Sequence, residues 1–242
     1  MKIITTAVIK GGTGKTTTAA ALAQCAADQG KKVLAIDLDP QANFTAMLSG
    51  RQDGASLKAL HGAPNINLKE IIQTTPQKID LLAGDPDLTA EKTTAGSISR
   101  LKEALDPVKR SYDLIIIDTP PQMGELVFNA LMASTGLIIP LEADLNSLKG
   151  LMQITGIAEQ IRQKNTRLKV LGAVLTRYDG RSNINKHIKG VIESSGAKVI
   201  GTIRPGIAIK EAQALQRSLY DYARRSKPAQ DYLALYNKIM ED

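Results

Sequence analysis

Two lysines flank a run of glycines in the segment VIKGGTGKTTTAAALA, residues 8–23. Glycines let backbone N–H groups turn inward around phosphate oxygens, and the helix that follows adds its positive N-terminal end. Lys15 stands where a phosphate-binding loop places the cation for the β- and γ-phosphates, and the Thr16 hydroxyl can ligate Mg²⁺. The predicted nucleotide contacts on this loop are Lys10, Gly11, Gly12, Thr13, Gly14, Lys15, Thr16 and Thr17.

The loop departs from the usual pattern G-x-x-x-x-G-K-[ST], because Ile9 stands where the first glycine belongs. Lys10 stands near that position, at the mouth of the loop. Since Lys15 already serves the phosphates, a second lysine is surplus within one subunit.

Three aspartates come at the ends of apolar runs. Asp37 and Asp39, in AIDLDPQAN, share a side of the extended chain at a place where open α/β sheets bind ligands. Asp118, in LIIIDTPPQMG, follows four apolar residues in the Walker-B layout, in which a carboxylate holds Mg²⁺ or its waters. Either of the first two could instead cap the next helix, Asp39 more readily than Asp37.

Apolar runs and helical patterns alternate along nearly the whole chain. We expect strands over 2–9, 32–38, 78–84, 113–119, 136–142, 169–176 and 197–203, and helices that include 15–29, 147–164 and 228–240. This order predicts an α/β fold: a single domain over residues 1–242 with a mostly parallel, twisted sheet and helices on both faces. The least regular stretch, 43–76, is expected on the surface.

The composition excludes several classes of protein. No stretch reaches 18 uninterrupted apolar residues, and the N-terminus lacks the layout of a secretory signal, so we expect a cytoplasmic protein. Cys25 is the only cysteine, which excludes intrachain disulfides and a cysteine-ligated iron–sulfur cluster within one chain.

Positive charge is concentrated in the C-terminal third. Residues 1–160 hold 15 Lys/Arg against 17 Asp/Glu, and residues 161–242 hold 16 against 7. A basic region of this kind predicts a polyanionic partner, although solvated surface lysines are an alternative. With no Trp and two Phe there is little to stack on bases, which favours contacts to duplex phosphates. Candidate contacts are Arg181, Lys186 and Lys189 on one predicted helix, and Arg204, Lys210, Arg217 and Arg224 further along.

The whole chain resembles the ParA/MinD family of deviant Walker-A P-loop ATPases, specifically its ParA, or partition, branch. KGGTGKTTT matches the loop K-G-G-x-G-K-[ST]-T of that family, DLDPQAN its second motif and IIIDTPP its Walker B. Residues 129–151 and 175–185 are also similar to the ParA branch. The resemblance implies ATP and ADP with Mg²⁺ as cofactors, and plasmid or chromosome segregation as the function.

The resemblance also assigns roles to residues. Lys10 matches the signature lysine, which reaches the phosphates of the partner subunit in an ATP-bound sandwich dimer. Asp39 matches the aspartate that positions the attacking water, and Asp37 and Asp118 match carboxylates on the magnesium side, beside Thr16. Arg177 and Pro205 fall at nucleotide-contacting positions of the family.

The implied partners are a second copy of the chain, double-stranded DNA without sequence preference, and a ParB-type centromere-binding protein that stimulates hydrolysis; no membrane is implied. The ATP-bound form is therefore expected on the nucleoid. One segment departs from the family: IRPGIAIKEA, residues 203–212, stands where relatives show a loop like IPRNVRLSEA. No N-terminal helix-turn-helix extension is expected, since Lys2 already leads into the first predicted strand.

Three other functions share parts of this pattern. A MinD-like positioning ATPase would bind membrane through a basic C-terminal helix, whereas this chain ends in Glu241-Asp242 with only Lys238 nearby. An ATP-dependent ligase or synthetase on the same fold would need a substrate pocket in an added domain. An electron-transfer relative would need more cysteines than Cys25.

Overall fold

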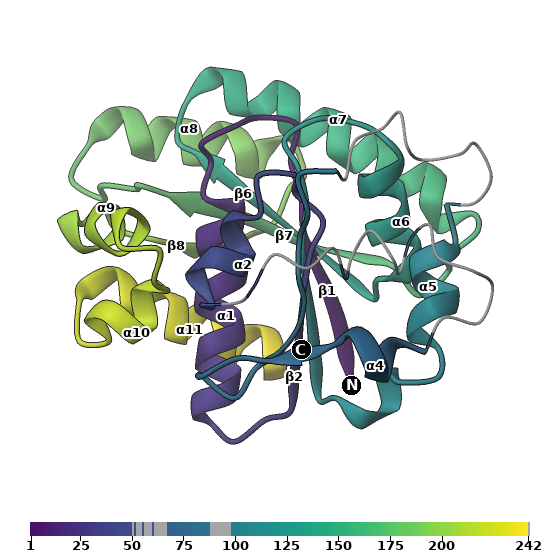
Figure 1. Ribbon diagram of the computed structural model, residues 1–242. Helices are drawn as coiled ribbons and strands as arrows, with labels where there is room; N and C mark the ends of the chain where they lie inside the picture. The colour runs from purple at the N-terminus through teal and green to yellow at the C-terminus, as the bar shows by residue number, and fades with distance from the viewer. Residues whose placement is uncertain (50, 52–54, 56–59, 61–66, 88–97, 242) are drawn as a thin grey trace.

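The computed structural model describes residues 1–49, 51, 55, 60, 67–87 and 98–241 (Figure 1). Its strands are β1 (Lys2–Thr6), β2 (Val33–Asp37), β3 (Gln73–Thr74), β4 (Asp80–Leu82), β5 (Leu114–Asp118), β6 (Gly136–Glu142), β7 (Lys169–Thr176) and β8 (Val199–Thr202). Its α-helices are α1 (Lys15–Asp28), α2 (Asn43–Met47), α4 (Leu68–Ile71), α5 (Arg100–Leu105), α6 (Glu125–Ala133), α7 (Leu145–Arg162), α8 (Asn183–Ser194), α9 (Ile207–Ala214), α10 (Leu219–Ala223) and α11 (Lys227–Glu241).

The strands form one sheet in the order β3-β4-β2-β5-β1-β6-β7-β8. Every neighbouring pair is parallel except β3–β4, which is antiparallel. The predicted α/β fold with a mostly parallel sheet is thus confirmed. No pattern in the sequence predicts β3, because a two-residue edge strand is too short to show a period.

Helices cover both faces of the sheet, as Figure 1 shows. Alternate residues of each strand point to opposite faces: in β5, Leu114 and Ile116 pack on the side of α1 and α11, whereas Ile115 and Ile117 pack on the side of α5 and α6. The second side continues over α7 and α8, beneath β6 and β7. Burial on both faces explains why the strands read as continuous apolar runs.

The prediction that residues 43–76 lie on the surface is wrong for its first part. Phe44, Met47 and Leu48 are buried against the sheet, because α2 follows β2 directly and turns its apolar side chains inward. Residues 50, 52–54, 56–59 and 61–66 of this stretch lie outside the described residues.

The carboxyl ends of four strands meet at one edge of the sheet. Because β1 lies between β5 and β6, with β2 beyond β5, the segments that follow these strands are brought together. This is the kind of switch point at which open α/β sheets bind ligands. Among the described helices, none combines the length and apolar character needed to cross a bilayer.

Candidate nucleotide site

The glycine-rich loop turns sharply between β1 and α1. Gly12 and Gly14 have φ angles of 75° and 87°, in the left-handed region that favours glycine. A Cβ on Gly14 would also lie 3.2 Å from Cγ2 of Thr176. The Thr176 hydroxyl donates to the carbonyl oxygen of Thr13 at 2.9 Å, so the end of β7 fixes the loop. The sequence motif did not identify Thr176, because this contact joins distant segments.

Lys15 begins α1 and is buried, with 6% of its surface exposed. Its Nζ donates to the carbonyl oxygen of Lys10 at 2.9 Å, so the side chain bends back along the loop. Burial lowers the pKa of Lys15, and the negative charges of Asp118 and Asp39 oppose that shift. A partly desolvated ammonium held inside a glycine loop favours an anionic ligand such as a phosphate.

Asp118 lies fully buried at the end of β5, next to the end of β2. It accepts hydrogen bonds from Thr16 Oγ1 at 2.7 Å and Thr6 Oγ1 at 3.1 Å. Asp37 is its register partner on β2. Burial, with Asp37 as the second cause, raises the pKa of Asp118 to about 8.

The Asp37 carboxylate accepts more of the described hydrogen bonds than the Asp118 carboxylate does. Its carboxylate accepts bonds from the backbone N–H and the hydroxyl of Thr45, both at 2.8 Å, and from the N–H of Asp39 at 3.1 Å. Burial raises the pKa of Asp37 to about 6, and these bonds hold it below that of Asp118. Thr45 is a residue that the motif missed, since its role depends on the fold of α2.

The donor set fits Mg²⁺ bound together with a nucleotide. Within the described part of the chain, no group of three or more His, Cys, Asp or Glu side chains could hold a metal by itself. Mg²⁺ at phosphate sites takes most of its ligands from phosphates and water, with one or two protein oxygens. Thr16 and Asp118 supply such oxygens, with Asp37 behind them. The Thr13 hydroxyl is buried and has no hydrogen-bond partner among the described residues, so it can bond a ligand in the loop.

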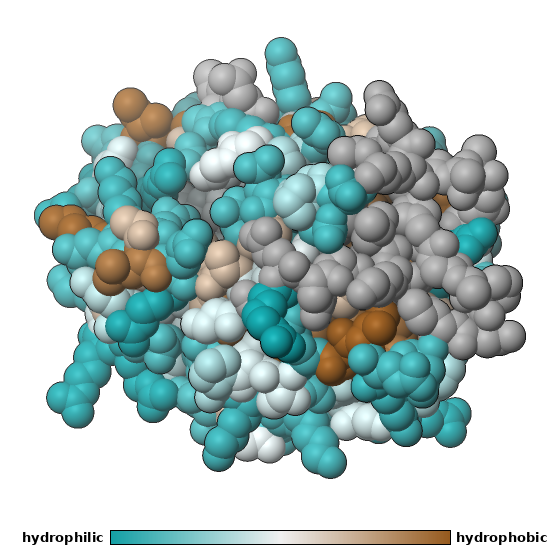
Figure 2. All heavy atoms as spheres, in the orientation of Figure 1, coloured by the Kyte–Doolittle hydropathy of each residue, from teal (hydrophilic) through white to brown (hydrophobic). Residues whose placement is uncertain are grey.

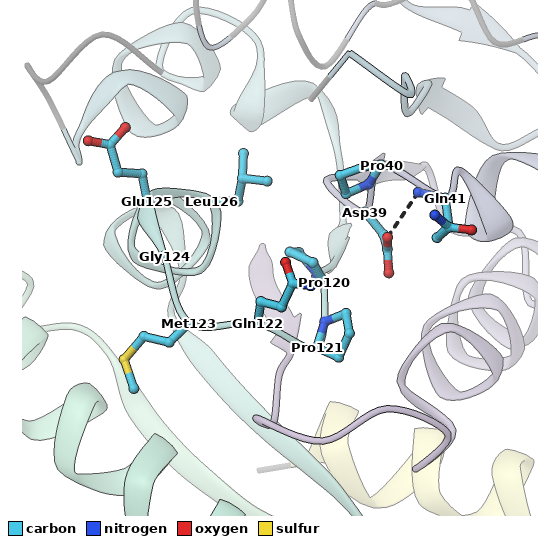
Figure 3. A pocket seen from close by; sticks show the side chains of 10 residues that line it. All are labelled: Asp39, Pro40, Gln41, Pro120, Pro121, Gln122, Met123, Gly124, Glu125 and Leu126. Atoms are coloured by element: carbon cyan, nitrogen blue, oxygen red, sulfur yellow. Dashed lines mark hydrogen bonds between the residues drawn. The ribbon is translucent and has the colours of Figure 1, made fainter. Parts of the chain in front are cut away.

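Asp39 follows Asp37 by two residues and lines a cavity of about 460 Å³ (Figure 3). Its Oδ1 accepts from the N–H of Gln41 at 3.0 Å, and α2 begins after Ala42, so Asp39 does not cap that helix. The cavity continues along the segment after β5, from Pro120 to Leu126. Asp39 thus lies where the site meets this cavity.

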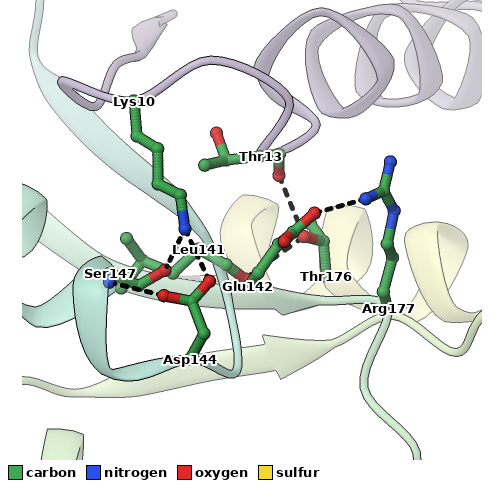
Figure 4. A network of polar contacts seen from close by, with 8 residues as sticks. All are labelled: Lys10, Thr13, Leu141, Glu142, Asp144, Ser147, Thr176 and Arg177. Carbon is green, nitrogen blue, oxygen red and sulfur yellow. Dashed lines mark hydrogen bonds and ion pairs between the residues drawn. The ribbon is translucent and has the colours of Figure 1, made fainter.

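Lys10 points away from the interior of its own loop (Figure 4). Its Nζ lies 2.5 Å from Oδ2 of Asp144 and 3.5 Å from the hydroxyl of Ser147, at the start of α7. Nearby, Arg177 donates to Glu142 Oε1 at 2.5 Å. Glu142, the last residue of β6, and Asp144, just before α7, therefore each hold one predicted nucleotide-binding cation.

Pro205 is exposed between β8 and α9, and no described contact joins it to the loop. The altered segment 203–212 does reach the site by another route. The segment runs into α9, which contains Gln213. The side-chain amide of Gln213 donates to Thr17 Oγ1 at 2.9 Å. Gln213 is therefore a site neighbour that sequence reasoning missed.

The predicted phosphate contacts do not form one free basic surface. Five of them are paired with carboxylates of the same chain: Arg181 with Asp179, Lys189 with Glu193, Arg204 with Asp231, Arg217 with Asp221, and Arg224 with Asp28. Lys186 and Lys210 are exposed, and no ion pair with a described residue involves them. The placement of Arg181 on a helix with Lys186 and Lys189 is wrong, because α8 begins only at Asn183.

Both exposed lysines lie at the same edge of the sheet as the loop. α8 follows β7 and α9 follows β8, and these two strands are parallel neighbours. Hydrophilic residues cover most of the face seen in Figure 2, with a few apolar ones exposed toward the left, where α9 and α10 lie. Ile207 and Leu215 at the two ends of α9 are among the exposed apolar residues.

Comparisons with known proteins show the family and the fold of the chain. Residues 1–170 match the family described as an AAA domain. The chain is 35% identical over 235 residues to the chromosome-partitioning ATPase Soj of Thermus thermophilus, covering 96% of this chain and 92% of that protein. It is 36% identical over 248 residues to the sporulation initiation inhibitor protein Soj of Bacillus subtilis, covering 98% of each.

Two solved structures with the same fold carry ADP and magnesium. The septum site-determining protein MinD of Pyrococcus horikoshii, complexed with Mg-ADP, matches with a TM-score of 0.81 and 26% identity over 98% of this chain and 95% of that one. The cobyrinic acid a,c-diamide synthase of Mycobacterium smegmatis, with bound ADP and magnesium, matches with a TM-score of 0.80 and 28% identity, over 100% and 94%.

Proposed function

Since this chain belongs to the ParA/Soj family of ATP-dependent partitioning ATPases, we propose that it is a two-state switch for moving DNA. ATP closes a sandwich dimer, the dimer binds double-stranded DNA of any sequence, and hydrolysis stimulated by a ParB-type partner releases it. The protein would be cytoplasmic, and its ATP-bound form would associate with the nucleoid. Residues 1–242 would act as one domain.

The position of Lys10 is the observation that carries this proposal. Lys15 occupies the inner side of the loop, whereas Lys10 leaves its own phosphate cradle and reaches Asp144 instead. A cation that does not serve its own site is available to a second one. In the closed dimer it would supply positive charge where negative charge develops during phosphoryl transfer.

The remaining roles follow from where each side chain lies. Lys15 would hold the β- and γ-phosphates, and Thr16 and Asp118 would hold Mg²⁺, which supplies positive charge to the phosphate oxygens when bound. Asp39, at the edge of the cavity, would position the attacking water. Arg177 and Pro205 would contact the nucleotide from the ends of β7 and β8.

DNA contacts are best assigned to Lys186 and Lys210. The other five candidates already neutralise carboxylates of their own chain, so little net charge remains for phosphates. Few contacts per protomer give weak nonspecific affinity, on the order of 10⁻⁴ M or poorer. A dimer presents two such surfaces, which raises the avidity without new chemistry.

The burial of the apolar face of α11 argues against the alternative of a membrane-binding ATPase. Its apolar side chains Tyr232, Leu235 and Tyr236 are buried in the core against α1 and the sheet. A helix that has already buried its apolar face within the protein has none left to insert between lipids.

The test is binding of a fluorescent random-sequence duplex with Mg²⁺ and either ATP or ADP. We expect binding with ATP only, indifferent to sequence, with a salt slope of roughly −0.9 per phosphate neutralised. Equal binding with both nucleotides, or ATP-dependent binding to anionic vesicles instead of DNA, would overturn the proposal.

A further inference from the structure

We infer that Asp144 is an internal latch: it holds Lys10 in its own subunit before dimerisation and thereby sets how readily the ATP-bound dimer closes. The inference rests on the proposed role of Lys10 in the partner site. Asp144 is accordingly a positioning residue, which acts through Lys10 and not on the nucleotide.

The latch is an ion pair between two segments that are far apart in the sequence. Lys10 Nζ and Asp144 Oδ2 are 2.5 Å apart, and their side chains are 29% and 35% exposed. The Ser147 hydroxyl adds a weaker contact at 3.5 Å. Figure 4 shows Lys10 extending from the loop to the first turn of α7.

The fold holds Asp144 in position independently of Lys10. Asp144 is the N-cap of α7, and its Oδ1 accepts from the N–H of Ser147 at 2.9 Å. One carboxylate oxygen thus fixes the helix end while the other faces Lys10. Burial by itself would raise the pKa of Asp144, but the bonds from Lys10 and Ser147 lower it, so the carboxylate stays charged.

This arrangement opposes closure in either of two ways. If Lys10 leaves Asp144 to reach the phosphates of the partner subunit, the ion pair is lost. If Asp144 stays with Lys10, its negative charge stands beside those phosphates and repels them. In both cases removing the negative charge of Asp144 favours the dimer.

The symmetry of the dimer doubles the effect. Two copies of the latch are lost for each dimer formed, so the effect of one latch on the dimerisation constant is squared. Exposed ion pairs are worth about 0.2–1 kcal/mol, a factor of roughly 1.4 to 5. We therefore expect the protein concentration at half-dimerisation to fall by about 2- to 30-fold when the latch is removed.

The experiment compares Asp144→Asn with the unaltered chain by sedimentation velocity, with Mg²⁺ and a nonhydrolysable ATP analogue. Asparagine keeps the helix cap and loses the charge. The matched control is Glu159→Gln, which breaks an exposed ion pair with Arg162 at the other end of α7. Asp144→Asn should lower the half-dimerisation concentration, and Glu159→Gln should leave it unchanged.

A double variant separates this inference from the proposed function. In a Lys10→Ala background, Asp144→Asn should add nothing, because there is no lysine left to hold. If Lys10→Ala weakens the dimer but Asp144→Asn alone does not tighten it, the latch is wrong and the role of Lys10 stands. If Lys10→Ala dimerises normally, both are wrong. Asp144→Ser, which also keeps a capping oxygen, must act in the same direction as Asp144→Asn.

Discussion

Thr16, in the first turn of α1, donates a hydrogen bond of 2.7 Å to Asp118 at the end of β5. The hydroxyl and the carboxylate that would both hold Mg²⁺ are thus each other's partners in the protein alone. Asp37 lies beside them in register on β2, so two buried carboxylates share this edge of the sheet. The site therefore places two acidic side chains together, and a bound cation would offset the repulsion between them.

This imbalance predicts that Asp118→Asn stabilises the nucleotide-free protein. Because Asp118 is buried next to Asp37, folding must keep its carboxyl group protonated well above its ordinary pKa or desolvate its charge, and asparagine removes that cost. Each unit of pKa shift is worth about 1.4 kcal/mol. We expect a gain on the order of 1 kcal/mol or more in the free energy of unfolding at neutral pH, measured by chemical denaturation without Mg²⁺. The same variant should lose Mg²⁺-dependent ATP hydrolysis.

The gain from Asp118→Asn should depend on pH in a defined direction. The pKa of Asp118 is raised from 3.8 to about 8 in the folded protein, so the folded state holds this proton more tightly than the unfolded state. Stability then falls as the pH rises through that window, and the advantage of Asp118→Asn grows from pH 5 to pH 8. A gain that shrinks over this range would contradict the assignment.

The two lysines of the loop should respond differently to replacement. Lys15→Ala removes the cation inside the cradle, so ATP binding should be abolished in isothermal titration. Lys10→Ala removes a side chain that points away from its own cradle, so the monomer should still bind ATP while dimerisation and turnover fall. Equal loss of nucleotide affinity in both variants would refute the assignment of Lys10 to the partner site.

Asp39→Ala should trap the ATP-bound dimer. The carboxylate touches neither Thr16 nor the hydroxyls around Asp118, and its described bond is to the N–H of Gln41. Its loss should leave nucleotide binding intact and stop water attack. Size-exclusion chromatography with ATP and Mg²⁺ should show a persistent dimer with little phosphate release, and normal turnover would return Asp39 to a structural role in the turn before α2.

The proposed DNA surface can be tested by reversing the charge of Lys186 and Lys210. Lys186→Glu with Lys210→Glu should weaken ATP-dependent duplex binding at least tenfold and flatten its salt dependence, without changing ATP affinity. The matched control is Lys164→Glu with Lys169→Glu, which changes the same charge at the amino end of β7. A loss of binding in the control of similar size would show that net charge matters and not this surface.

The sequence predicted those parts of the candidate site that a short local motif defines. Asp37 and Asp118 end buried strands, and Asp39 and the loop over 9–17 come soon after such strands, so parallel pairing brings them to one edge. The contacts that complete the site join segments far apart in the chain: Thr176 to Thr13 and Asp144 to Lys10. No local pattern encodes such pairings.

The same limit explains why net charge in the C-terminal third does not by itself select residues for the proposed DNA surface. Net charge counts every arginine, but the fold decides which of them face a carboxylate. Arg224 pairs with Asp28 at the end of α1, and Arg204 pairs with Asp231 on α11. Lys186 and Lys210 stand out only when these partners are known.

The most direct test of a lysine acting across the dimer is complementation between two inactive variants. Lys10→Ala retains Asp39, and Asp39→Ala retains Lys10, so in a mixed dimer one site receives both groups and the other neither. The proteins are mixed in equal amounts before ATP is added, and phosphate release is followed. Random pairing would make half the dimers mixed, each with one complete site, so the upper limit is about one quarter of normal turnover. The weaker dimerisation of Lys10→Ala lowers the expected value below that limit, but it stays above the turnover of either variant alone. Turnover that stays at the level of the separate variants would contradict the role of Lys10 in the site of the partner subunit.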